Sequence, residues 1–229
     1  MELLRTLDEK VSPGRAAVVT VDVQNDFCHQ DGFLGRLGAP MGLIQAMVPR
    51  LARLLDTARE RGVPVIHVIS HHDEEYASPV VTEQKLRHGL PMERDGRPLR
   101  DAPYCLKGTW GAELYGIDSR PGEEIVIKHR YSGFKGTNLD LLLRSAGIQT
   151  VVLTGVATNA CVESTGRDVY MHDYYLVFVS DGTATTSPAA HQATLANIDQ
   201  FFGQVATADE IEAAWDTARG RPRAVAVGR

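Results

Sequence analysis

The chain has 229 residues, 43% of them hydrophobic and 23% charged, which is enough to bury the core of one large domain. Its net charge of -5 argues against a general nucleic-acid binder, because no surplus of cations exists to neutralise phosphates. No run approaches the roughly 18 apolar residues of a membrane-spanning helix, and the N-terminus lacks the apolar core of a secretory signal. Because the three cysteines, Cys28, Cys105 and Cys161, form no paired framework, we expect a cytoplasmic protein with a free thiol.

Six apolar, β-rich runs predict strands, and helical patterns separate them. Hydrophobicity within each run is continuous rather than alternating, which is typical of strands covered on both faces in a parallel sheet. In chain order the runs cover residues 16–22, 63–69, 124–128, 150–155, 174–180 and 204–206.

Five helical patterns accompany these strands. Pro49 suits the first position of a helix that Gly62 ends, since proline lacks the N–H that this position leaves unpaired. The other patterns cover residues 138–146, 161–172, 188–202 and 208–218. The alternation predicts one α/β domain over residues 1–229, a three-layer α/β/α sandwich around a mainly parallel sheet of about six strands.

Two segments fall outside this alternation. Residues 71–122 are irregular, rich in charge, proline and glycine, and too long for a simple connection, so we expect a functional cover with short helices. Residues 219–229 contain four arginines and no core pattern, which predicts a flexible tail.

Three chemically distinct side chains stand at or beyond the carboxyl ends of predicted strands. Asp22 ends the first strand, Lys128 ends the third, and the fourth leads through Gly155 to Cys161. Because open parallel sheets bind ligands at this edge, we expect a carboxylate, an ammonium and a thiol to meet there. Asp22 can move a proton, Lys128 can supply positive charge, and Cys161 can attack a carbonyl carbon. A buried Asp22–Lys128 ion pair without a catalytic role is the alternative.

Cys161 also lies where a buried strand turns into a helical pattern. The unpaired N–H groups and the positive dipole end of a helix N-terminus stabilise a thiolate, and the same groups can hold an oxyanion. A cysteine that only packs is the alternative, and packing is the role that we expect for Cys28 and Cys105.

Three separate blocks of the chain resemble the isochorismatase-like cysteine hydrolase superfamily. They are VTVDVQNDF at 19–27, KHRYSGF at 128–134 and GVATNACVEST at 155–165, and the resemblance spans about residues 15–215. It implies an Asp–Lys–Cys triad, which carries over to Asp22, Lys128 and Cys161. It also implies a cis peptide bond between Val156 and Ala157, with the N–H groups of Ala157 and Cys161 directed at an oxyanion. Asp26 does not match a triad position, and we interpret it as structural.

Within that superfamily, the second and third blocks and KGTWG at 107–111 are similar to the branch of ureidoacrylate amidohydrolase and biuret hydrolase. That branch hydrolyses small, linear, carbamoylated amides without a cofactor and releases ammonia or a carbamate. The resemblance therefore implies a small-molecule amide substrate and a homo-oligomer, either a dimer or a tetramer. A nicotinamidase-like or maleamate-like amidase is one alternative, and a catalytically silent binding or assembly protein is another.

Two relatives are distinguished by particular residues. True isochorismatases cleave an enol ether and lack the nucleophilic cysteine, so Cys161 argues against that reaction. Nicotinamidases bind a metal through an Asp and two His after the second strand, and residues 70–75 (SHHDEE) have those residue types without that spacing. We expect no required metal, although the same side chains could ligate zinc.

Aromatic and amide side chains near the triad predict a mostly apolar pocket for a small planar amide. Asn25 and Gln24 offer hydrogen bonds to a ureido group, and for Gln24 packing beneath the triad is the alternative. Strand alternation turns His129 away from Lys128. The predicted substrate-binding residues are Gln24, Asn25, Phe27, Trp110, Tyr131 and Phe134.

Overall fold

The computed structural model describes residues 3–94, 97–98 and 102–219, and its centre is a six-stranded sheet in which every neighbouring pair is parallel. The strands follow the order β5-β2-β1-β6-β7-β8. Strand order therefore reverses between β1 and β6, which is the place where open α/β sheets bind ligands. Their bounds are β1 Ala16–Val21, β2 Val65–Ser70, β5 Glu124–Lys128, β6 Thr150–Val156, β7 Tyr175–Ala184 and β8 Gln204–Ala206.

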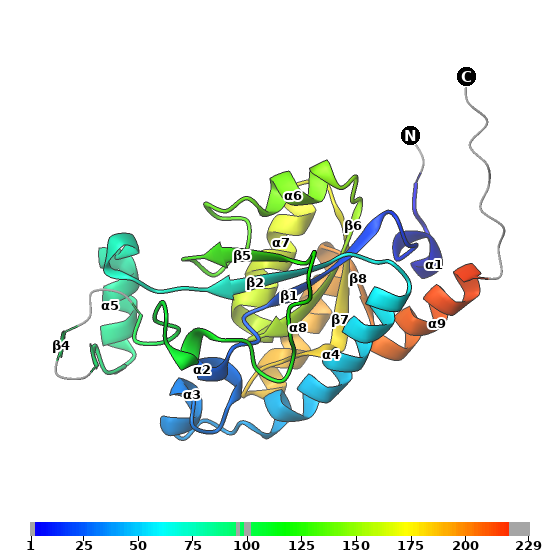
Figure 1. Cartoon of the computed structure of the whole chain (residues 1–229). Helices are drawn as coiled ribbons and strands as arrows, with labels where there is room; N and C mark the ends of the chain where they lie inside the picture. Colours follow the sequence, from blue (N-terminus) through cyan, green and yellow to red (C-terminus); the bar gives the residue numbers. More distant parts are fainter. Residues whose placement is uncertain (1–2, 95–96, 99–101, 220–229) are drawn as a thin grey trace.

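Helices cover both faces of the sheet, so the predicted three-layer α/β/α fold is confirmed (Figure 1). Alternate residues of β1 point into opposite layers, with Val18 in one apolar core and Val19 in the other. On the Val18 side lie α1 (Leu7–Lys10), α4 (Gly42–Glu60) and α9 (Ala208–Arg219). On the Val19 side lie α6 (Leu139–Ser145), α7 (Glu163–Met171) and α8 (Pro188–Phe201).

Two of the predicted helix starts are wrong. Helix α4 begins at Gly42 and contains Pro49, because its apolar stripe extends back to Ile44 and Met47 while Pro49 sits on the exposed side. The helix containing Cys161 begins with a π-helical turn, η3 (Thr158–Val162), ahead of α7. Cys161 therefore lies within a wide turn rather than at the first position of an α-helix.

The segment at 71–122 is a cover that contains short elements, as predicted. Its helices are η1 (Glu74–Tyr76), α5 (Pro79–Arg87) and η2 (Trp110–Ala112), and β3 (Glu93–Arg94) pairs with β4 (Arg97–Pro98). In Figure 1 the arrowheads of β2 and β5 point toward α5, and the small helices α2 (Asn25–Cys28) and α3 (Phe33–Arg36) lie below them. The carboxyl edge of the sheet thus faces the cover.

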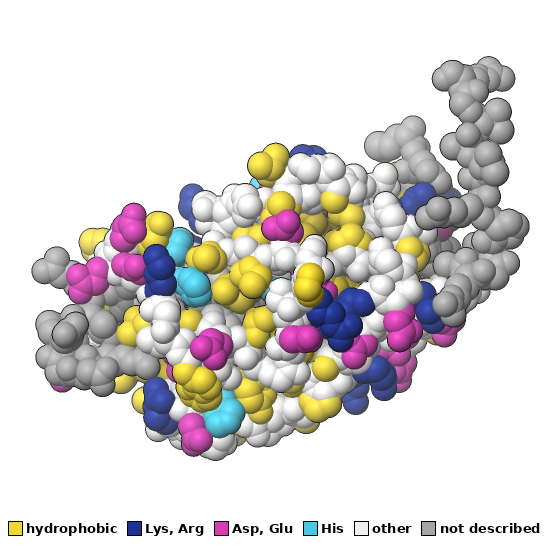
Figure 2. All heavy atoms as spheres, viewed as in Figure 1, with side chains coloured by type: hydrophobic (Ala, Val, Ile, Leu, Met, Phe, Trp, Pro, Cys, Tyr) yellow, Lys and Arg dark blue, Asp and Glu magenta, His cyan; other side chains and the backbone are white. Residues whose placement is uncertain are grey.

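The outer surface mixes charges of both signs. Figure 2 shows acidic and basic side chains interleaved on the face that carries α4. Arg53 of α4 pairs with Glu212 (3.2 Å), and the largely buried Arg59 pairs with Glu123 (2.7 Å). Among the described residues, no helix is long and apolar enough to cross a bilayer. Residues 220–229, most of the predicted tail, lie outside the described part of the chain, and Arg219 ends α9.

Candidate active site

Asp22 follows the last residue of β1 and turns the chain away from the sheet. Its φ of 54° is in the left-handed region, which aspartate tolerates better than most residues but which still costs free energy. The side chain is 1% exposed, and Oδ1 accepts a hydrogen bond from Ser70 Oγ at 2.9 Å. Oδ2 lies 2.8 Å from Lys128 Nζ in an ion pair and accepts no well-aligned hydrogen bond from the described residues. Oδ2 is thus available to receive a proton.

Lys128 is the last residue of β5, and its ammonium is equally buried. Besides the Asp22 carboxylate, Nζ contacts Ser70 Oγ at 2.8 Å and the Arg130 carbonyl at 3.1 Å. The β2–β5 register pairs Ser70 with Lys128, so the two side chains reach Asp22 from adjacent strand ends. Sequence reasoning missed Ser70, although the same strand-end pattern could have found it.

Cys161 completes the group from the η3 turn after β6. Its thiol interacts with both Asp22 and Lys128, and all three residues line one cavity. Burial raises the pKa of the Cys161 thiol to about 12, the Asp22 carboxylate adds to the rise, and Lys128 opposes it. The expected stabilisation of a resting thiolate is therefore wrong, because burial and the neighbouring carboxylate outweigh the ammonium. Cys161 therefore carries its proton at rest.

The backbone between β6 and Cys161 approaches β1 closely. Gly155 has a φ of +116°, and a Cβ at this position would lie 2.1 Å from the Val21 carbonyl oxygen, so only glycine fits. The peptide bond between Val156 and Ala157 is cis, as the family resemblance implied. Ala157 and Cys161 both line the cavity, and their backbone role toward an oxyanion stays a prediction.

The cavity has a volume of about 470 Å³ and lies between the sheet edge and the cover. Of the six predicted substrate-binding residues, Phe27 and Tyr131 line it. Apolar walls that sequence reasoning missed come from α3, α4 and the cover: Phe33, Leu34, Ile44, Val80, Val81, Leu90 and Tyr104. Such a lining suits a small, planar, uncharged group next to the thiol.

The other four predicted residues lie outside the cavity lining. Gln24 is fully buried and links the end of β2 to the cover. Its Nε2 donates to the carbonyls of Ser70 (2.9 Å) at the end of β2 and of Ala112 (2.7 Å) in the cover. Its Oε1 accepts from Ser70 N at 2.8 Å, so packing beneath the triad, the alternative, is the observed role. Asn25 donates through Nδ2 to the Trp110 carbonyl at 2.8 Å.

Trp110 and Phe134, the two aromatic residues among these four, contact other rings outside the cavity. Trp110 is 45% exposed, with its ring edge-on to His29 at 5.1 Å. Phe134 is buried and stacks on His172 at 4.6 Å, in the apolar core that also contains residues of α6 and α7. The prediction that strand alternation turns His129 away from Lys128 is also wrong. His129 lines the cavity, because β5 ends one residue earlier and the alternation stops there.

Asp26 has the structural role that we expected. Its Oδ1 accepts from Phe33 N at 3.0 Å and its Oδ2 from Cys105 N at 2.7 Å, so one buried carboxylate ties α3 to the cover. Cys28 and Cys105 are fully buried and free, in agreement with a packing role. Within the described ranges, no three His, Cys, Asp or Glu side chains gather as a metal site requires. Whether activity needs a metal stays a prediction.

Comparison with known proteins gives consistent relatives. The isochorismatase domain family matches residues 16–210. Ureidoacrylate amidohydrolase RutB from Rhizobium rhizogenes is 35% identical over 205 residues, which cover 87% of this chain and 83% of that protein. The crystal structure of N-carbamoylsarcosine amidase from Thermoplasma acidophilum superposes with a TM-score of 0.65 at 30% identity, over 85% of this chain and 97% of the other. A cysteine hydrolase from Pseudomonas syringae pv. phaseolicola gives 0.77 at 25% identity, over 95% and 99%.

Proposed function

Because this chain belongs to the isochorismatase family of hydrolases, we propose that it is a cysteine amidohydrolase that cleaves the C–N bond of a small, linear, carbamoylated amide. The observation that carries the proposal is the meeting of Asp22, Lys128 and Cys161 at one end of a largely apolar cavity. The names of two relatives, a ureidoacrylate amidohydrolase and an N-carbamoylsarcosine amidase, support a carbamoyl group as the reacting part.

The first half of the reaction forms a bond between Cys161 Sγ and the amide carbonyl carbon. Since the thiol pKa is about 12, its proton must leave during the attack, and Asp22 Oδ2 receives it. The carbonyl oxygen becomes an oxyanion, held by the N–H groups of Ala157 and Cys161. Collapse then breaks the C–N bond, and the departing nitrogen takes the proton from Asp22.

The second half returns the enzyme to its starting state. The product of the first half is an acyl-enzyme in which Cys161 Sγ carries the acyl or carbamoyl group. A water molecule attacks its carbonyl carbon and gives a proton to Asp22. The C–S bond breaks, Sγ recovers the proton from Asp22, and the acid or carbamate leaves. The nitrogen product is ammonia or an amine, according to which side of the carbamoyl carbon is cleaved.

Lys128 stays charged throughout and supports Asp22. Its ammonium keeps the carboxylate in place through the 2.8 Å ion pair, and Ser70 fixes the other carboxylate oxygen. The positive charge also favours the sulfur anion that forms during attack, because Lys128 lowers the pKa of the Cys161 thiol.

An ammonia-release assay tests this function. The substrates are biuret, ureidoacrylate, maleamate, N-carbamoyl amino acids and nicotinamide, so that carbamoylated amides are compared with the nicotinamidase-like and maleamate-like alternatives. We expect turnover of carbamoylated amides, and Cys161→Ser should remove nearly all of it without changing the melting temperature. Full activity in that variant would exclude the thioester mechanism, and release from nicotinamide alone would exclude the proposed substrate class.

We also propose a homo-oligomer in a reducing, cytoplasmic setting. Three free cysteines agree with a reducing compartment. Apolar side chains exposed on α6, α7 and α8 (Leu141, Tyr170, Met171 and Phe201) offer a surface for association. Tyr174, close to Met171 in the chain, is buried instead and donates to Asp140 Oδ1 at 2.9 Å. Light scattering after size exclusion distinguishes a monomer from a dimer or tetramer.

A further inference from the structure

Lys85 is a buried ammonium that the proposed chemistry does not use. It lies on α5 in the cover, is 5% exposed and lines the same cavity as the triad. Its Nζ donates one hydrogen bond, to the Tyr131 hydroxyl at 3.2 Å, and no carboxylate of the described residues lies within ion-pair distance. Burying a charge without a counterion is costly, so this arrangement calls for an anion that binds there.

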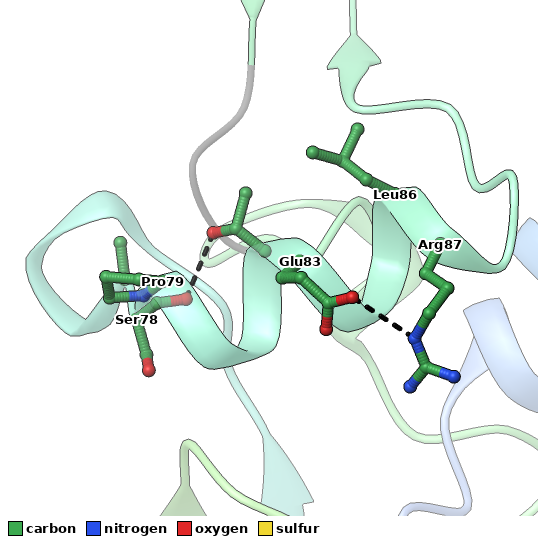
Figure 3. Close-up of a pocket in the computed structure, with 7 residues that line it drawn as sticks. Ser78, Pro79, Glu83, Leu86 and Arg87 are labelled. Carbon is green, nitrogen blue, oxygen red and sulfur yellow. Dashed lines mark hydrogen bonds and ion pairs between the residues drawn. The ribbon is translucent and has the colours of Figure 1, made fainter.

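The carboxylate that α5 itself carries faces the other way. In Figure 3, Glu83 and Arg87 form an ion pair of 3.2 Å in a pocket that Ser78, Pro79 and Leu86 also line, and both charged side chains are more than 60% exposed. Glu83 is thus paired on the outside of the cover, while Lys85 lines the cavity on the inside.

Two tyrosine rings hold the ammonium at the cavity wall. Lys85 Nζ lies 5.0 Å from the ring centroid of Tyr104 and 5.4 Å from that of Tyr131, within the range of cation–π attraction. Burial raises the pKa of the Tyr104 phenol, so Tyr104 stays neutral and does not compensate the charge. Because the Tyr131 hydroxyl accepts from Lys85, its own proton is free to donate.

The charges around the cavity are unbalanced. Histidines aside, the described lining residues include three cations, Lys85, Lys128 and Arg130, and one carboxylate, Asp22. Asp22 pairs with Lys128, and the Arg130 guanidinium donates to the carbonyls of Tyr76 and His129. In a chain with a net charge of -5, this cavity therefore carries a local positive surplus.

We propose that Lys85 and the Tyr131 hydroxyl bind a carboxylate at the end of the substrate remote from the reacting carbamoyl group. Resting on the proposed function, this assigns the substrate to the N-carbamoyl or ureido carboxylic acids and ranks neutral amides such as biuret below them. Lys85 is then the specificity-determining residue of the cavity, acting on substrate binding rather than on the chemical step.

A matched pair of ureas tests this inference. The acid is 3-ureidopropanoate, and its neutral partner carries an isopropyl group in place of the carboxylate. We expect Lys85→Met, which keeps the apolar stem, to lower kcat/KM for the acid roughly 10- to 100-fold, mostly through KM. Turnover of the neutral urea should change by less than about threefold, since uncharged contacts are retained. Tyr131→Phe should give a smaller loss for the acid, and Lys135→Met, at an exposed site, should change neither substrate.

The results separate a failure of the Lys85 assignment from a failure of the proposed function. Equal losses for acid and neutral urea in Lys85→Met, or a wild-type enzyme without preference for the acid, would overturn the assignment of Lys85. If wild type hydrolyses neither these ureas nor the amide panel, the proposed function fails instead. In that case, calorimetric titration of both ureas still tests the assignment of Lys85. Tighter binding of the acid than of the neutral urea, lost in Lys85→Met, supports the assignment, and equal binding of the two ureas overturns it.

Discussion

Asp22→Asn gives a sharp test of how the Cys161 thiol is activated. At pH 8 a thiol with a pKa of about 12 is ionised to about one part in 10⁴, against about one part in ten for a thiol at the usual 9.0. The more basic thiolate is also the stronger nucleophile, which offsets part of this roughly thousandfold lower thiolate fraction. With a Brønsted slope of about 0.4–0.5, alkylation of Cys161 should be roughly 30- to 60-fold slower than that of an ordinary cysteine.

The variant should change alkylation and turnover in opposite directions. Because the Asp22 carboxylate raises the thiol pKa, Asp22→Asn should lower that pKa and speed alkylation at pH 8. Turnover should nevertheless fall about 10²- to 10⁴-fold, since the proton acceptor is gone. No such divergence is expected if Asp22 merely maintains the fold.

The assay follows iodoacetamide labelling from pH 6 to 11, with peptide mass spectrometry to assign the thiol. Cys28 and Cys105 are fully buried, so the label reports on Cys161. Asp31→Asn, which removes an exposed carboxylate, is the matched control. A wild-type inflection near pH 8 to 9, or slower alkylation in Asp22→Asn than in wild type, would refute the reasoning.

Lys128→Met should slow alkylation at pH 8, because the ammonium lowers the thiol pKa, and it should cost about 3–5 kcal/mol of stability by leaving Asp22 buried and unpaired. Urea unfolding and labelling measure both effects, and unchanged stability would contradict the buried ion pair. Burial would raise the pKa of Glu123, but hydrogen bonds led by that from Arg59 hold it at about 2, below the usual 4.5. This ionised carboxylate therefore contributes about 3 kcal/mol above pH 4.5, lost as the pH falls toward 2. Urea unfolding of Glu123→Gln between pH 6 and 3 should show a stability that depends much less on pH than that of the wild type. An equal pH dependence in both proteins would argue against the contribution of Glu123. Prolonged chelation should leave amidase activity intact, whereas loss that zinc restores would establish a metal requirement.

The sheet was predictable because its strands are buried on both faces, and continuous apolar runs mark such strands directly. The bounds of β5 and β8 agree with the predicted runs, and the others differ by a few residues at their ends. Helix starts were less predictable, since Pro49 is tolerated inside α4 on its exposed side. The π-helical turn at Cys161 has no periodicity that sequence reasoning could detect over five residues.

The positions of strand-end residues can be predicted from the sequence more readily than those of residues in the cover. Asp22, Ser70 and Lys128 converge because adjacent parallel strands end at one edge, so the register alone brings them together. The cavity walls instead depend on how residues 71–122 fold back over that edge, which no local pattern specifies. Lys85 shows the consequence: in the sequence it is one more charge in a charged segment, and only its burial between Tyr104 and Tyr131 makes it a candidate for substrate binding. On the proposed function, the reaction type depends on the sheet edge and the choice of substrate on the cover, so substitutions in α5 should alter specificity before they alter the chemical step.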